Sequence, residues 1–412
     1  MNWCTILFIS YILCGCSQKQ LVTPPGEGLF IDLKKNEIHS QYRESIKLSD
    51  VPFRDQSILT KKGSVVDDQV GHLGGYYTFS LMSSRRKYDI IGRTELIKIK
   101  HEFEVLRLLQ SKTSANYFLD GVSTVGKNIT NGLWSLFSKP IHTSENIYSA
   151  SGKLIKKLSV VDGLNDFFSD SPEKRALADK LNLDVYSYSP EVQLFLRNAA
   201  KHYSRGQLFG KGMTWLIPAS PLSLVISAGG LNAESETFLS NKSPEEVARY
   251  SRESLLSMGC SEILVQGVLD NAYINPRSLF YMTQFIENMK NVEGAGHIPL
   301  EYIISAQSRN ELTTVFYQLE LYSELHQKYR IAELFNCGDL IGVRRQSNIS
   351  PMVLAPYDYF ELNSENKAVI SRLLELSPSR SELWCSGAID NSAQIYLLNN
   401  DISFRANYAG PQ

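Results

Sequence analysis

YYTFSLMSSRRKYDIIGRTELIKIKHEFEVLRLLQS, residues 76–111, is the stretch whose two patterns decide the fold prediction. Residues 76–82 and 87–91 alternate weakly in polarity and flank the turn-forming run SSRR, which predicts a β-hairpin. After Gly92, apolar residues recur every three to four positions, which predicts a helix over about 93–111. The apolar face of this helix comprises Leu96, Ile99, Phe103, Leu106 and Leu109 or Gln110, and the charged side chains off that face are Glu95, Lys98, Glu102 and Arg107.

Helix-initiation signals continue along the chain. The triplet Ser-Pro-Glu occurs three times, beginning at Ser171, Ser189 and Ser243. Serine accepts a hydrogen bond from the first helical turn, proline is tolerated there, and glutamate is favoured by the positive end of the helix. Helices are therefore predicted to begin near residues 172, 190 and 244, and later periodic segments predict helices over about 276–290, 309–330 and 364–376.

Extended segments are fewer. Residues 340–359 indicate β structure, and the C-terminus is expected to form a brief helix and a last strand. We therefore predict a mainly α (α+β) protein, with a multi-helix body, a small N-terminal β-hairpin and a small C-terminal β element. The predicted parts are a lipoprotein signal peptide (1–16), a tether and extended lead-in (17–50), a β-hairpin plus long helix (51–115), a helical body (116–330) and a small mixed α/β C-terminal part (331–412).

The first sixteen residues, MNWCTILFISYILCGC, indicate export. Residues 5–15 form an uncharged, mostly apolar run that is too short to span a bilayer and is typical of a signal-peptide core. The run ends at Leu13-Cys14-Gly15-Cys16, which resembles the box of bacterial lipoproteins. The resemblance implies that Cys16 is acylated and can be labelled with palmitate, and that Ser17 directs the protein to the outer membrane, facing the periplasm. An ordinary cleaved signal peptide and a buried first helix are the alternatives.

Four further segments are similar to a family of exported bacterial proteins that has no assigned activity. They are residues 88–92 (YDIIG), 174–181 leading to 184–186 and 189–190, 249–252 with 258–259, and 355–359 (APYDY). The similar positions are helix starts and packing residues. The resemblance implies one architecture over most of residues 70–410, and it supplies no activity, cofactor or partner.

Composition excludes several classes of protein. The 412 residues include 42 Lys and Arg against 43 Asp and Glu, a formal net charge of -1 that argues against a nucleic-acid partner. No run of about 20 apolar residues occurs, which excludes a polytopic membrane protein. The segment GVSTVGKN, residues 121–128, nearly fits a phosphate-binding loop. Asn128 replaces the hydroxyl residue that would bind Mg²⁺, so no nucleotide is expected.

Recognisable catalytic and metal-binding motifs are absent from the sequence. There is no G-x-S-x-G or H-E-x-x-H motif, and the seven histidines are scattered, so no cofactor or metal is expected. Ser171 and Lys174 have the spacing of a Ser/Lys acyl enzyme, which a helix start at residue 172 explains better. Beyond the signal peptide and Cys16, three cysteines are expected to be buried apolar side chains, with any pairing left open: Cys260, Cys337 and Cys385.

Two segments are candidate interaction surfaces. Residues 120–139 place apolar side chains on one helical face with few lysines or arginines opposite, which fits either a closely packed helix or one lying on a membrane. The candidate surface residues there are Ile129, Trp134 and Phe137. Tyr357-Asp358-Tyr359 places an acid between two aromatic rings, a candidate contact for a sugar or peptide ligand. An edge strand with an exposed Asp is the plainer alternative.

The favoured hypothesis is a lipid-anchored cell-envelope protein that acts as a non-catalytic binding or scaffold module. Its expected partners are the membrane, through the lipid, and an envelope protein or glycan. One alternative is an exported hydrolase acting on an envelope polymer or polysaccharide, because catalytic residues can come together from distant positions. Another is a membrane-interacting secreted effector that uses the amphipathic segments within residues 120–168.

Overall fold

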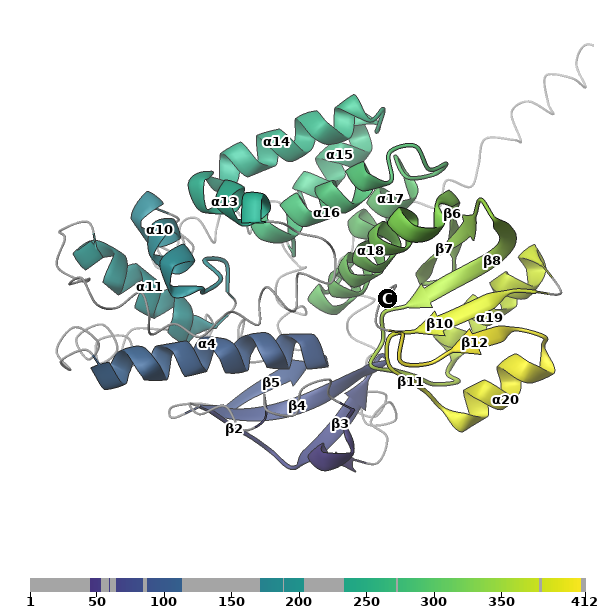
Figure 1. Ribbon diagram of the computed structural model, residues 1–412, viewed down its shortest axis with the longest axis horizontal. Helices are drawn as coiled ribbons and strands as arrows, with labels where there is room; N and C mark the ends of the chain where they lie inside the picture. Colours follow the sequence, from purple (N-terminus) through teal and green to yellow (C-terminus); the bar gives the residue numbers. More distant parts are fainter. Residues whose placement is uncertain are drawn as a thin grey trace, which may run out of the picture.

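The structure is a computed structural model, and it describes residues 45–52, 59, 64–83, 87–112, 171–187, 189–203, 233–271, 273–377 and 380–408. Helices predominate and the strands gather in separate sheets, which confirms the mainly α (α+β) prediction (Figure 1). Every helix within these ranges is either too short or too polar to span a lipid bilayer. The predictions that fall outside the described residues concern Cys16, the segment 120–168, and Ile129, Trp134 and Phe137 within it.

An antiparallel sheet forms the first part of the described chain. Its strands are β1 (Ile46–Lys47), β2 (Ser64–Val66), β3 (Gln69–Leu73), β4 (Tyr76–Ser83) and β5 (Lys87–Ile91). Their order is β1-β3-β4-β2, with β5 also paired to β4. The predicted hairpin is confirmed, because Phe79 of β4 pairs with Ile90 of β5. The sheet is larger than predicted, since β1, β2 and β3 are too short to show a clear alternation of polarity.

Helix α4 (Arg93–Lys112) lies along this sheet and confirms the helix predicted over 93–111 (Figure 1). Its apolar face packs on the sheet in one core with helices α10 (Pro172–Leu181) and α11 (Pro190–Tyr203). Ser171 caps α10 by accepting a hydrogen bond from the backbone N–H of Lys174, as predicted. We call β1–β5, α4, α10 and α11 the N-terminal unit.

A layer of helices follows in the sequence. It comprises α13 (Ala233–Asn241), α14 (Pro244–Ser257), α15 (Glu262–Leu269), α16 (Pro276–Asn288), α17 (Ile298–Ser305) and α18 (Arg309–Tyr329). The side chain of Ser243 and that of Glu246 form a reciprocal capping box at the start of α14, as the sequence predicts. The bounds of α16 and α18 agree with the predicted helices to within two residues. We call α13–α18 the helical layer.

A five-stranded mixed sheet forms the C-terminal part, where a small β element is predicted. Its strands are β6 (Ile331–Cys337), β7 (Leu340–Arg345), β8 (Asn348–Ala355), β10 (Glu382–Cys385) and β12 (Ser403–Arg405). They lie in the order β12-β10-β8-β7-β6. A two-stranded pair sits beside this sheet, β9 (Tyr359–Phe360) with β11 (Ala388–Ile389).

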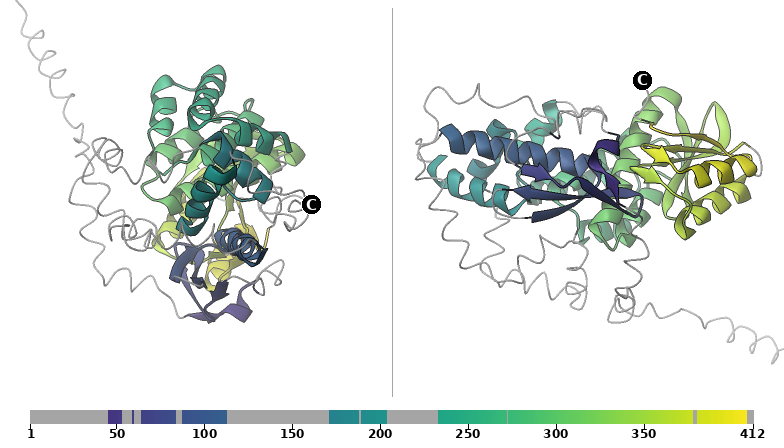
Figure 2. Two further views of the ribbon diagram at one scale, coloured as in Figure 1. Left: turned by 90° about the vertical axis from the view of Figure 1, so that its left-hand side faces the viewer. Right: turned by 90° about the horizontal axis from the view of Figure 1, so that it is seen from below.

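Helices cover both faces of the five-stranded sheet. One face shares the core of the helical layer, and the other packs on α19 (Ser364–Leu376) and α20 (Asn391–Asn399). Because both faces are buried, strands such as β7 are apolar without alternation, and their number is hard to predict. Figure 2 shows, from below, this C-terminal sheet beside the N-terminal unit. The prediction of buried, apolar cysteines is confirmed, since Cys260, Cys337 and Cys385 are buried free thiols.

Candidate functional site

A cavity of about 110 Å³ lies where the N-terminal unit meets the helical layer, lined by both charged and aromatic side chains. Each of these two parts has its own apolar core. Charged side chains reach the cavity from both parts: Glu95 and Lys98 from α4, Asp184 from the segment after α10, Arg277 from α16 and Arg309 from α18. The boundary between the two parts therefore places five charged side chains around one cavity.

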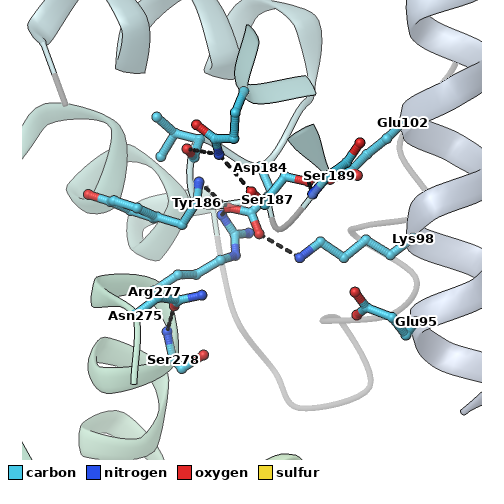
Figure 3. Close-up of polar contacts among 12 residues, drawn as sticks. Glu95, Lys98, Glu102, Asp184, Tyr186, Ser187, Ser189, Asn275, Arg277 and Ser278 are labelled. Atoms are coloured by element: carbon cyan, nitrogen blue, oxygen red, sulfur yellow. Dashed lines mark hydrogen bonds and ion pairs between the residues drawn. The ribbon is translucent and has the colours of Figure 1, made fainter. Parts of the chain in front are cut away.

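Helix α4 contributes through a charged face beside its apolar stripe. Glu95, Lys98 and Glu102 are spaced three and four residues apart, so they line up along that face. Figure 3 shows all three side chains extending from α4 towards the segment that contains Asp184. A charged helix face normally lies in water, but Glu102 is fully buried here. The sequence pattern shows that these residues lie off the apolar face, and tertiary packing then covers them.

The segment that follows α10 holds Asp184 in place. Asn182 ends α10 in the left-handed conformation, with φ of 55°. The side-chain amide of Gln193 donates to the carbonyl oxygens of Val185 (2.8 Å) and Ser187 (2.7 Å). The backbone N–H of Tyr186 donates to Oδ1 of Asp184 at 2.9 Å. These bonds hold the segment and the Asp184 carboxylate in one orientation.

Asp184 is the most deeply buried acid of the cavity wall, with 1% of its side chain exposed. Its Oδ2 atom lies 2.6 Å from Nζ of Lys98, and its Oδ1 atom lies 4.0 Å from Nη1 of Arg277. Burial by itself raises the pKa of Asp184, but the positive charges of Lys98 and Arg277 outweigh burial and lower the pKa to about 2. Asp184 is therefore ionised at neutral pH.

The pKa of Glu102 is shifted in the opposite direction from that of Asp184. Burial raises the pKa of Glu102 to about 8, against the smaller lowering effect of Lys98. Its Oε2 atom accepts a hydrogen bond from the hydroxyl of Ser187 at 2.8 Å. Its Oε1 atom is buried and has no hydrogen-bond partner among the described residues. Glu102 is thus mostly protonated at neutral pH and adds little negative charge beside the cavity.

The opposite wall comes from α16 and α18. Nη2 of Arg309 lies 2.8 Å from Oε1 of Glu95 across the boundary between the two parts. Burial raises the pKa of Glu95, but Arg309 and Lys98 lower it more, so the net shift is downward. Nη2 of Arg277 lies 2.5 Å from Oε1 of Glu236 on α13. The guanidinium of Arg277 also stacks over the ring of Tyr281, 5.4 Å from its centre.

The predicted contact Tyr357-Asp358-Tyr359 lies elsewhere, at a junction between the N-terminal sheet and the C-terminal part. The alternative of an exposed Asp is wrong, because Asp358 is only 6% exposed. Its carboxylate accepts hydrogen bonds from Nε of Arg93 (2.7 Å) and from the backbone N–H groups of Arg93 (3.0 Å) and Tyr77 (3.2 Å). The carboxylate thus stabilises the junction, and contact of either tyrosine with a ligand stays a prediction.

Sequence reasoning missed the residues that line the cavity. They come from positions as far apart as residues 95 and 309, and no local motif connects such positions. The one usable signal was the row of alternating charges on α4, Glu95, Lys98 and Glu102, which is consistent with ion pairing to another element. No group of three or more His, Cys, Asp or Glu within the described ranges is arranged to hold a metal ion.

Comparisons with known proteins give no further guide to the cavity. No protein-family model, no curated protein and no solved structure matches this chain. The resemblances to bacterial lipoproteins and to a family of exported proteins therefore stay predictions. Function has to be argued from the cavity itself.

Proposed function

We propose that this chain is a non-catalytic binding module that holds a small, charged ligand in the cavity between the N-terminal unit and the helical layer. One observation carries the proposal: five charged side chains converge there on a cavity of about 110 Å³. Ligand sites occur preferentially at such boundaries between separately packed parts of a protein.

The energetics support a functional reason for this arrangement. Removing a charged group from water costs several kcal/mol, and an apolar boundary of the same shape is often as stable as a buried ion pair or more stable. Asp184 and Lys98 are 1% and 14% exposed, yet they border a cavity instead of close-packed atoms. Stability alone would favour an apolar boundary, so binding of a polar molecule accounts better for the charges.

The acids of the cavity favour binding over hydrolysis. A glycosidase needs one carboxyl that donates a proton and a second carboxylate that acts as base or nucleophile. Glu95 and Asp184 both have lowered pKa values, so neither holds a proton at neutral pH. Glu102 keeps its proton, but it is fully buried and does not line the cavity. The alternative of an exported hydrolase therefore has less support.

The proposal includes a location in the cell envelope. The lipobox-like sequence ending at Cys16 supports acylation of that cysteine, which would hold the binding module at a membrane, and Ser17 supports the outer membrane. Several acyl chains together anchor a protein stably. Palmitate labelling of the wild type and of Cys16→Ala tests this part; equal labelling of the two proteins would contradict it.

A cavity-filling substitution tests the binding function. In the full chain purified in detergent, propionate, inorganic phosphate, methylammonium and propionamide serve as probes, and the melting temperature is measured. Ser278 lines the cavity, so Ser278→Phe should abolish any stabilisation by a probe. Ser257→Phe is the matched control, because Ser257 is exposed at the end of α14. If no probe raises the melting temperature, or if stabilisation persists in Ser278→Phe, the binding function is wrong.

A further inference from the structure

We infer that the ligand of this cavity is a small organic monocarboxylate, bound through the guanidinium of Arg277. The inference rests on the proposed binding function and adds the chemical class of the ligand. It depends on the charge balance of the cavity wall, on the unused hydrogen-bond donors of Arg277, and on the size of the cavity.

The charge of the wall favours a ligand with one negative charge. The described lining residues include three cations, Lys98, Arg277 and Arg309, and two carboxylates, Glu95 and Asp184. Asp184 pairs with Lys98 and Glu95 with Arg309, whereas the partner of Arg277, Glu236, lies outside the lining and is 43% exposed, so water screens that pair. A monoanion can therefore replace Glu236 at Arg277 without changing the balance of charge, whereas a dianion or a cation would leave the site with an unbalanced charge.

Arg277 has the donors that a carboxylate needs. A guanidinium carries five N–H donors in a planar fork. Within the described part of the chain, Arg277 makes one hydrogen bond, from Nη2 to Glu236, and its Nη1 atom lies 4.0 Å from Asp184, too far for a second. Figure 3 shows the side chain reaching from α16 towards Asp184 and Lys98. The side chain is 14% exposed, so its unused donors gain by meeting an acceptor.

The cavity itself has room for only a few ligand atoms. A protein cavity of about 150 Å³ accommodates benzene, which has six heavy atoms. The cavity here is smaller, about 110 Å³, and the ring of Phe316 borders it. A carboxylate with a short carbon chain fits both the volume and the mixed polar and aromatic wall.

Glu236 competes with such a ligand for Arg277. It lies outside the cavity lining, its side chain is 43% exposed, and it accepts hydrogen bonds from both Arg277 and Tyr281. Binding of a carboxylate to Arg277 would weaken this pair. Substituting Glu236 by a neutral residue should therefore strengthen binding, a result that a purely structural role of Arg277 does not produce.

Isothermal titration calorimetry on the full chain in detergent tests the inference, with propionate, inorganic phosphate and propionamide as probes. We expect wild type to bind propionate with a Kd of roughly 1 mM or tighter, which is attainable for a ligand of this size. Arg277→Lys keeps the positive charge but loses the planar set of guanidinium donors, so it should weaken propionate binding about tenfold. Glu236→Gln should strengthen binding a few-fold. Arg345→Gln is the matched control, because Arg345 pairs with Glu382 in the C-terminal sheet and is 12% exposed.

The outcomes separate this inference from the proposed function. If propionamide or phosphate binds in preference to propionate, and Ser278→Phe abolishes that binding, the cavity is a ligand site but its ligand is not a monocarboxylate. If propionate binds equally to wild type and Arg277→Lys, or more weakly to Glu236→Gln, the role of Arg277 is wrong. If no probe binds to wild type, both the inference and the proposed function fail.

Discussion

Two buried carboxylates, Asp358 and Asp184, pair with cations of the same helix but have different surroundings. Asp358 pairs with Arg93 at the start of α4, and two backbone N–H groups complete its hydrogen bonding. Asp184 pairs with Lys98, one turn and a half further along, and accepts from the backbone N–H of Tyr186, but it borders a cavity with a second cation 4.0 Å away. The chain supplies donors to both carboxylates, so the difference between them is the space beside Asp184. The close packing around Asp358 indicates a role in stability, and the cavity beside Asp184 leaves room for another molecule.

The junction around Asp358 is also the more tightly packed of the two. The backbone N–H of Tyr359 donates to the carbonyl oxygen of Gly75 at 2.9 Å. Gly75 has φ of +83°, and a Cβ atom there would lie 2.7 Å from the ring of Tyr357. Across the cavity boundary, the ion pairs of Arg309 with Glu95 and of Arg277 with Asp184 are made by side chains. Substitutions at the junction should therefore affect stability, and substitutions at the cavity should affect binding.

The largest effect is expected from Asp358→Ala. This change leaves the guanidinium of Arg93 and two backbone N–H groups without their acceptor, so the free energy of unfolding should fall by about 3 kcal/mol. Urea denaturation measures it, with Asp89→Ala on the exposed side of β5 as the control. The affinity for propionate should not change. A loss under 1 kcal/mol would remove the distinction between the two carboxylates.

Gly75→Ala should have the next largest effect, about 2 kcal/mol of destabilisation, because it combines a positive φ with a steric clash. Gly259→Ala is a matched control: Gly259 has φ of +85° but nothing within 4 Å of an added Cβ. The difference between the two variants isolates the contact with Tyr357. Equal urea midpoints would mean that this close contact does not hold the junction together.

The stability of the protein should also depend on pH, through Glu102 beside the cavity. The pKa of Glu102 is raised to about 8 in the folded state, by burial most of all, against the lowering effect of Lys98 and with a further raising effect of Asp184. Between about pH 4.5 and pH 8 the unfolded chain releases this proton and the folded chain keeps it, so wild-type stability should decline as pH rises. Below pH 4.5 both states are protonated, and above pH 8 both are ionised.

Glu102→Gln should remove this decline in the free energy of unfolding between pH 5 and pH 8. Urea midpoints at pH 5, 6.5 and 8 measure it. Asp184 does not interfere, because its lowered pKa gives stability that is lost only as pH falls from about 4 towards 2. A variant that shows the same decline as wild type would mean that Glu102 is ionised in the folded protein.

The smallest effect on stability is expected from Arg309→Gln. Arg309 is 30% exposed and its partner Glu95 is 23% exposed, so water screens the pair and the loss should stay under about 1 kcal/mol. Arg252→Gln, which breaks the more exposed pair with Glu262, should cost still less. Urea denaturation of both variants in low and in high salt measures the two losses in the free energy of unfolding. A loss of several kcal/mol at Arg309 would show that the cavity boundary serves stability after all.

Local chemistry in the sequence determined much of the secondary structure. The helices at residues 172, 190 and 244 begin where Ser-Pro-Glu predicts them, because a cap depends on residues within one turn. The hairpin of β4 and β5 and the helix α4 were likewise predictable from periodicity. The strands β2 and β6 were not predicted, since short strands and strands buried on both faces lack a clear alternation.

Tertiary structure alone decided where the charges meet. Periodicity shows that Glu102 lies off the apolar face of α4, but a helix cannot indicate that another part of the chain will cover its polar face. The pair of Glu95 with Arg309 joins residues 214 positions apart. Such a contact depends on how the apolar cores of the N-terminal unit and the helical layer dock, and the free energy of that docking comes from the whole interface rather than from any local motif.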